Sequence, residues 1–70
     1  MEKKFCIFNG RPIYSVSSED SILVYSFNYE DNLFHEDFKY LKYILYDPSG
    51  DVESVSEEYF WKYVDELKRK

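Results

Sequence analysis

The sequence has few of the residues that hold very small proteins together or build metal sites. Its 70 residues include one cysteine, one histidine, two glycines and two prolines. Cys6 cannot form a disulfide within the chain, and its place between Phe5 and Ile7 predicts a small buried side chain. One histidine and one cysteine in separate parts of the chain do not make a zinc site without carboxylates. We therefore expect no metal and no cofactor.

Catalytic motifs are absent from the sequence as well. It contains no G-x-S-x-G, P-loop or dinucleotide-binding pattern. His35 stands beside Glu36 and Asp37, which predicts a solvated histidine in an acidic loop rather than a catalytic base. The stretch "DPSGDVE" faintly resembles a calcium loop, but its glycine is at the wrong position for an EF-hand. The sequence favours a protein that is not an enzyme.

Long apolar runs and a signal peptide are also lacking. The apolar runs are too short to span a membrane, so we expect no membrane partner. A lone cysteine without a signal peptide is typical of a reducing compartment, which predicts a cytoplasmic location. The length predicts a single small domain, residues 1–70.

Basic residues are scarce over most of the chain. The net charge is −5, and the span from Phe5 to Leu67 holds four basic residues against thirteen acidic ones. Such a surface repels phosphate backbones, which argues against nucleic acid, and it attracts partners with a basic surface. The alternative is that the acidity only keeps the domain soluble.

Aromatic residues, in contrast, are abundant: six Phe, eight Tyr and one Trp. A very small domain without disulfides needs large side chains to fill its core, and this explains most of them. Those left outside the core are candidates for contacts with a partner. A symmetric homodimer and a Tyr-rich sheet face that stacks single-stranded nucleic acid are the two alternatives.

Local patterns predict a small antiparallel sheet. Asn9-Gly10 between apolar runs predicts a type I′ hairpin of about 4–16, with Phe8 opposite Arg11. Ile7 then faces Pro12, which fits if the second strand is a sheet edge at that point. Strict alternation predicts a strand of about 22–29, and we expect its aromatic face to be the core face: Leu23, Tyr25, Phe27 and Tyr29.

The segment 33–46 is ambiguous. Its tyrosines and isoleucine favour a strand from about Lys39 to Tyr46, which "DPSG" would join to the next strand as a hairpin of about 39–55. The expected pairs are Tyr46 with Val52 and Ile44 with Ser54. An extra helix within 33–45 stays open, because four apolar residues fall on one helical arc: Phe34, Phe38, Leu41 and Leu45.

The last segment predicts a helix of about 56–69. Ser54 and Glu57 form a capping box, with Ser56 as the alternative N-cap, and the charges suit the helix dipole. Trp61 falls at the border of the expected core stripe. That stripe comprises Tyr59, Phe60, Tyr63, Val64 and Leu67.

Together these patterns predict an α+β fold, a small antiparallel sheet covered by one C-terminal helix. The function they favour is a small acidic protein–protein interaction module, an adaptor or inhibitor of a host or partner protein. A phage or mobile-element origin, with carboxylates that imitate nucleic-acid phosphates, is the sharper hypothesis. The candidate partner-binding residues are Trp61, Glu30, Asp31, Glu36, Asp37, Glu57 and Asp65.

Overall fold

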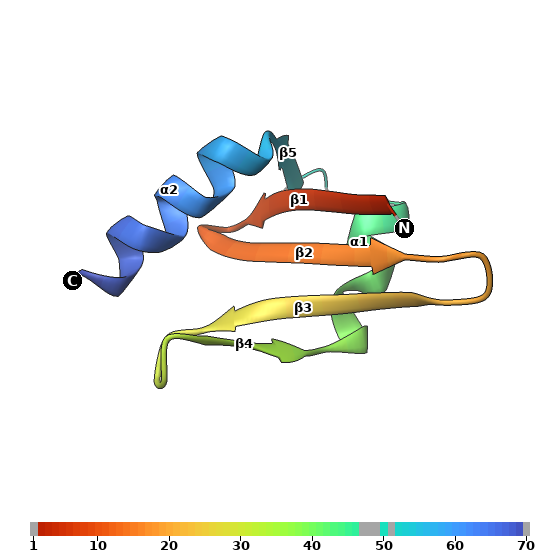
Figure 1. Ribbon diagram of the computed structural model, residues 1–70, viewed down its shortest axis with the longest axis horizontal. Coiled ribbons are helices and arrows are strands. Elements are labelled where there is room, and N and C mark those ends of the chain that lie inside the picture. The colour runs from red at the N-terminus through yellow and green to blue at the C-terminus, as the bar shows by residue number, and fades with distance from the viewer. Residues whose placement is uncertain (1, 47–49, 51, 70) are drawn as a thin grey trace.

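The computed structural model describes residues 2–46, 50 and 52–69. Five antiparallel strands form one sheet in the order β4-β3-β2-β1-β5, and helical segments pack against it (Figure 1). The predicted α+β class is confirmed. The elements are β1 (Glu2–Phe8), β2 (Arg11–Ser17), β3 (Ile22–Asn28), β4 (Leu33–Glu36), the 3₁₀ turn η1 (Phe38–Tyr40), α1 (Leu41–Leu45), β5 (Val52–Val55) and α2 (Glu57–Lys68).

The first hairpin follows its turn chemistry. Asn9 and Gly10 have φ angles of +49° and +81°, as a type I′ turn requires. The predicted register is confirmed, because Phe8 lies opposite Arg11 and the next pair inward joins residues 7 and 12. The pairing of β2 with β3 begins only at residue 13, so the proline at 12 leaves no ladder hydrogen bond unmade on that side.

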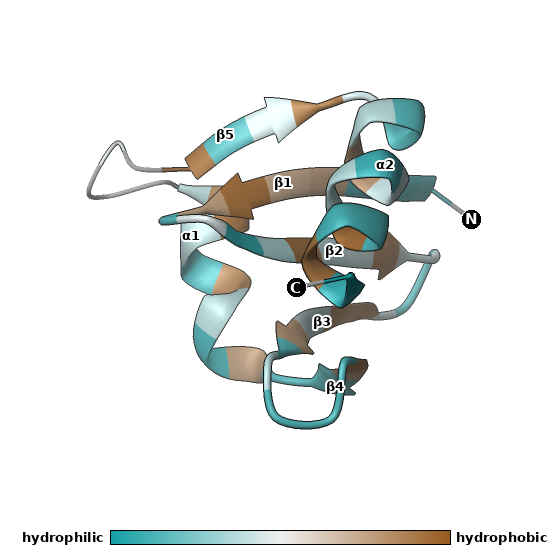
Figure 2. Cartoon of the chain, turned by 90° about the vertical axis from the view of Figure 1, so that its left-hand side faces the viewer, coloured by the Kyte–Doolittle hydropathy of each residue, from teal (hydrophilic) through white to brown (hydrophobic). Residues whose placement is uncertain are grey.

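The sheet is covered on both faces, so the fold has three layers. Figure 2 shows α2 and α1 on opposite sides of the strands. The core between α2 and the sheet contains Phe5, Ile7, Phe27, Phe60 and Val64. The core on the α1 side contains Ile13, Val24, Tyr40 and Ile44.

Because helices cover both faces of the sheet, β3, the predicted strand of about 22–29, buries side chains on both of its faces and not only on the aromatic one. Phe27 is fully buried under α2, as predicted for the aromatic face. Val24 on the other face is also fully buried, under α1, and Tyr29 beyond the strand end is 47% exposed. Alternation alone therefore identified the strand but not its second buried face.

The predicted strand from Lys39 to Tyr46 is wrong, because this segment forms η1 and α1. The hairpin of about 39–55 is wrong as well. Val52 pairs with Phe8, so β5 lies along β1. Likewise, the partner of Ser54 is residue 6 rather than residue 44. Residues 47–49 of the expected turn lie outside the described residues, while Gly50 has the predicted positive φ, +72°.

Capping and packing explain the helical outcome. The Asp37 side chain accepts a backbone N–H of η1 at 3.2 Å and so caps its first turn. Tyr40 and Ile44, four residues apart, both point to the sheet and bury against Ile13 and Val24. A helix places these two side chains on one side, whereas a strand paired with β5 could not cover this face of the sheet.

α2 begins after Ser56, whose hydroxyl accepts the backbone N–H of Tyr59 at 3.1 Å. Ser54 lies in β5, so of the two candidates Ser56 is the N-cap. Phe60 and Val64 are buried as predicted, but Tyr59 is 51% exposed, and its place in the core stripe was wrong. The predicted stripe is wider than the line along which α2 contacts β1 and β2, so its outer member stays in solvent.

In the described part of the chain, no helix has the length and apolar character to cross a membrane.

Two tyrosines join the first hairpin turn to the rest of the fold. The hydroxyls of Tyr29 and Tyr63 both donate to the Gly10 carbonyl, at 2.9 and 2.8 Å. Burial raises the pKa of the Tyr63 hydroxyl, and the nearby Tyr29 raises it further. Cys6, in the adjacent β1, is fully buried as predicted.

Candidate protein interface

Trp61 lies on the flank of α2, against a cluster of aromatic rings. Its ring centroid is 4.9 Å from that of Phe60, 5.8 Å from Phe34, 6.0 Å from Tyr14 and 6.2 Å from Phe5. It nevertheless remains 42% exposed. Trp61 therefore covers the edge of the core and also presents a ring to the solvent.

Three half-buried rings continue this surface across the sheet. Tyr14 of β2 stacks on Tyr25 of β3 with ring centroids 5.0 Å apart, and Phe34 of β4 meets Tyr14 edge-on at 5.0 Å. Burial raises the pKa of Tyr14, with a further contribution from Tyr25, so this hydroxyl stays uncharged at neutral pH. We call Tyr14, Tyr25, Phe34 and Trp61 the aromatic face.

Two carboxylates border the aromatic face. Glu57, one turn before Trp61 on α2, accepts the indole Nε1–H at 3.3 Å. Glu36 lies directly opposite Tyr25 in the β3–β4 register, so both side chains leave the same face of the sheet. Three of the predicted partner-binding residues, Trp61, Glu57 and Glu36, are thus brought to one surface.

Two other predicted site residues are engaged in local pairs. Asp65 forms an ion pair with Arg69 at 2.9 Å along α2. Asp31 accepts the backbone N–H of Leu33 at 3.0 Å and lies 2.7 Å from His35 Nε2. The Leu33 N–H and, after it, His35 hold the pKa of the Asp31 carboxyl below its usual value. These pairs stabilise the turn before β4 and the end of α2.

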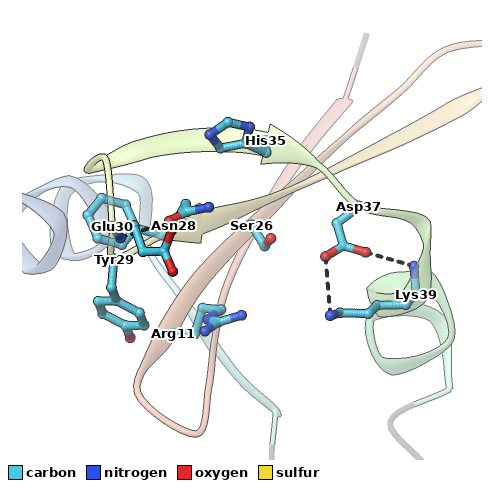
Figure 3. A pocket seen from close by; sticks show the side chains of 9 residues that line it. Arg11, Ser26, Asn28, Tyr29, Glu30, His35, Asp37 and Lys39 are labelled. Carbon is cyan, nitrogen blue, oxygen red and sulfur yellow. Dashed lines mark hydrogen bonds and ion pairs between the residues drawn. The ribbon is translucent and has the colours of Figure 1, made fainter.

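The last two predicted residues, Glu30 and Asp37, line a polar hollow of about 360 Å³ on the α1 side of the sheet (Figure 3). The described carboxylates therefore divide between the two faces. Asp37 and Asp65 are paired with cations, and Asp31 is paired with His35. Imitation of nucleic-acid phosphates needs one acidic face. The carboxylates that the structure describes do not gather in that way.

Sequence reasoning missed three of the four rings of the aromatic face. The alternation of β3 indicated that Tyr25 and Phe27 share a side, but no local signal places Tyr14 or Phe34 next to Tyr25. Those contacts depend on the order β4-β3-β2, which sets residues far apart in the chain side by side. The amphipathic pattern of α2 did place Trp61 at the border.

Among residues 2–46, 50 and 52–69, no three His, Cys, Asp or Glu side chains group in a way that could hold a metal ion. The arrangement around Trp61 supplies apolar area, ring faces and negative charge, which are features of a binding surface. No protein-family model, curated protein or solved structure matches the chain, so its function has to be inferred from its own residues.

Proposed function

We propose that this chain is a small protein–protein interaction module that binds a basic segment of another protein through its aromatic face. The observation that carries the proposal is Trp61, which is 42% exposed although its ring already packs on four others. A ring held in this way loses little conformational freedom on binding. Tryptophan is also enriched among the residues that dominate interface energies.

The charges around the aromatic face favour a basic partner. Glu57 and Glu36 border the rings of Trp61 and Tyr25. A lysine or arginine of the partner can place its cation over an exposed ring and close to a carboxylate. The net charge of −5 adds long-range attraction and speeds the encounter with such a partner.

In this proposal the chain acts in the cytoplasm as an adaptor or inhibitor, without catalytic activity or a cofactor of its own. Small size, an acidic body and the lack of a catalytic constellation are typical of accessory proteins of phages and other mobile elements. That origin stays a hypothesis. Sequencing of the neighbouring genes tests it independently of binding.

The test of the proposal is affinity capture from a cell lysate, followed by binding measurements with the purified partner. We expect Trp61→Ala to lose the partner that the wild type retains. Tyr59→Ala is the matched control, because Tyr59 is another exposed aromatic of α2 (51%, against 42% for Trp61) that stacks on Tyr63 instead of on the aromatic face. It should keep the partner.

Retention of the same partner by folded Trp61→Ala would overturn the proposal. Glu36→Lys serves as a second variant, since Glu36 is exposed in the edge strand β4 and its replacement leaves the core intact. It should weaken binding to a basic partner and leave the circular dichroism spectrum unchanged.

The two alternatives give different results. A mass of two chains by light scattering, which Trp61→Ala returns to one chain, would assign the aromatic face to a symmetric homodimer. The Tyr14–Tyr25 stack could also carry nucleotide bases, but Glu36 beside it repels phosphates. Retention of a single-stranded oligonucleotide on a filter at low salt would favour that function instead.

A further inference from the structure

The polar hollow lies on the side of the sheet opposite the aromatic face, and binding there does not depend on the proposed function. Its walls come from β2, β3, β4 and η1, and its volume is about 360 Å³. Arg11, Ser26 and Lys39 contribute hydrogen-bond donors to it. Figure 3 shows Arg11 and Lys39 reaching from opposite sides toward the space below Ser26.

Ser26 forms the floor of the hollow. This residue is only 6% exposed as a whole, but its hydroxyl is not shut off from both solvent and a hydrogen-bond partner among the residues that the structure describes. Buried hydroxyl groups in folded proteins are normally paired. The Ser26 hydroxyl borders the hollow and can pair with water or with a molecule bound there.

Arg11 is a half-buried cation that is held in place by two tyrosines. One of its Nη atoms donates to the Tyr40 hydroxyl at 2.9 Å, and the guanidinium lies over the Tyr29 ring at 5.2 Å. Within the described part of the chain, no carboxylate comes within ion-pair distance of it. Its remaining N–H groups form a planar fork that matches the geometry of a carboxylate or phosphate.

Other polar groups of the hollow complete a site for a small molecule. The Lys39 ammonium is 3.7 Å from Asp37, near the limit of an ion pair, so it can turn to a stronger anion. The side-chain oxygen of Asn28 accepts the N–H of Glu30 at 2.8 Å, which leaves the Asn28 NH₂ group as a donor. The carboxylates of Asp37 and Glu30 can accept from ligand donors.

We propose that this hollow binds a small metabolite that carries a carboxylate or a phosphate, with the oxyanion between Arg11, Ser26 and Lys39. Hydroxyl or ammonium groups elsewhere on the ligand donate to Glu30 and Asp37. The volume is near the lower end for ligand pockets, which favours a small metabolite over a macromolecule.

The experiment is a titration of the isotope-labelled protein with inorganic phosphate and, separately, with acetate at constant ionic strength, followed by NMR. We expect saturable shifts of the amide signals of Ser26, Asn28 and Lys39 with one of the two probes. Saturation with phosphate assigns a phosphate ligand, and saturation with acetate assigns a carboxylate ligand. Absence of saturation with both probes overturns the proposal.

Four variants make the test specific. Arg11→Gln should weaken binding about tenfold, and Ser26→Ala about threefold, because each removes a hydrogen bond to the anion. Lys39→Gln, on an exposed side chain, keeps the test valid if Arg11→Gln fails to fold. Lys62→Gln on α2 removes one positive charge away from the hollow and should bind as the wild type does. Equal weakening by Lys62→Gln and Lys39→Gln would show diffuse attraction and overturn the site.

Discussion

Gly10 holds a backbone position that side-chain-bearing residues adopt only with strain. Its φ is +81°, and its carbonyl accepts hydrogen bonds from Tyr29 and Tyr63. A Cβ added there would meet only the Tyr63 hydroxyl, at an ordinary contact distance of 3.5 Å. We therefore expect Gly10→Ala to lower the free energy of unfolding by about 1 kcal/mol or more through backbone strain alone.

Gly50→Ala is the matched variant for Gly10→Ala. Gly50 has a φ of +72°, and no atom of the described residues lies within 4 Å of the added carbon, so the same strain should produce a similar loss. Urea unfolding of both variants measures the two losses. A Gly10→Ala protein as stable as the wild type would contradict the turn assignment.

Alkaline pH should destabilise the fold through Tyr14 and Tyr63. Their pKa values are raised by burial in the folded protein, so the folded state holds these protons more tightly than the unfolded state. Their contribution to stability is complete below the ordinary tyrosine pKa of about 10 and is lost as pH rises through the raised values. Free energies of unfolding measured from neutral pH to above about pH 10 give the size of this loss of stability.

Tyr63→Phe should remove part of this alkaline dependence, and it should also cost stability at neutral pH because the bond to the Gly10 carbonyl is lost. Tyr46→Phe, at a residue that is 78% exposed, is the control and should change neither quantity. A Tyr63→Phe protein with the full alkaline loss would show that other groups cause it.

At the scale of elements, α2 depends on its N-terminal cap. Ser56→Ala should lower the free energy of unfolding by about 1 kcal/mol, because the hydroxyl that accepts the Tyr59 N–H is removed. Ser54→Ala is the comparison, since Ser54 is an exposed residue of β5 and does not cap the helix. Chemical denaturation of both variants distinguishes the two serines; a larger loss for Ser54→Ala would reverse the assignment.

Two neighbouring aromatics of α2 should differ in their contribution to stability. Phe60 is fully buried, so Phe60→Ala should cost about 3–5 kcal/mol, enough to unfold a domain of this size. Trp61 packs on other rings but stays half exposed, so Trp61→Ala should cost about 1–2 kcal/mol, or roughly 4–16 °C in melting temperature.

Thermal unfolding and quenching of the single tryptophan measure these differences. An emission that is blue-shifted and protected from quencher in a proven monomer would contradict the partial exposure of Trp61. It would also remove Trp61 as a contact residue.

At the scale of the whole molecule, charge should control association more than stability. Glu36→Lys, beside the aromatic face, should slow association with a basic partner several-fold, and added salt should slow the wild type in the same direction. Glu19→Lys, in the turn between β2 and β3, makes the same charge change away from that face. Stopped-flow association rates that are equal for the two variants would locate the contact elsewhere.

The amino-acid sequence by itself determined the parts of this protein that depend on neighbours in the chain. Asn9-Gly10 specified the hairpin turn and its register, because few residues accept positive φ. Alternation specified β3, and the serine cap with its acidic first turn specified α2. The same helical pattern placed Trp61 at the border of the core.

Only the tertiary structure decided the segment from Lys39 to Tyr46 and the composition of both candidate sites. The residues of this segment favour a strand and a helix about equally. The helix forms because it buries Tyr40 and Ile44 against a face of the sheet that would otherwise be exposed. The aromatic face and the polar hollow each combine residues from at least three elements. These contacts depend on the order of the strands in the sheet, which brings together side chains that are far apart in the chain. No short stretch of sequence specifies that order, because it is set by which distant side chains bury one another.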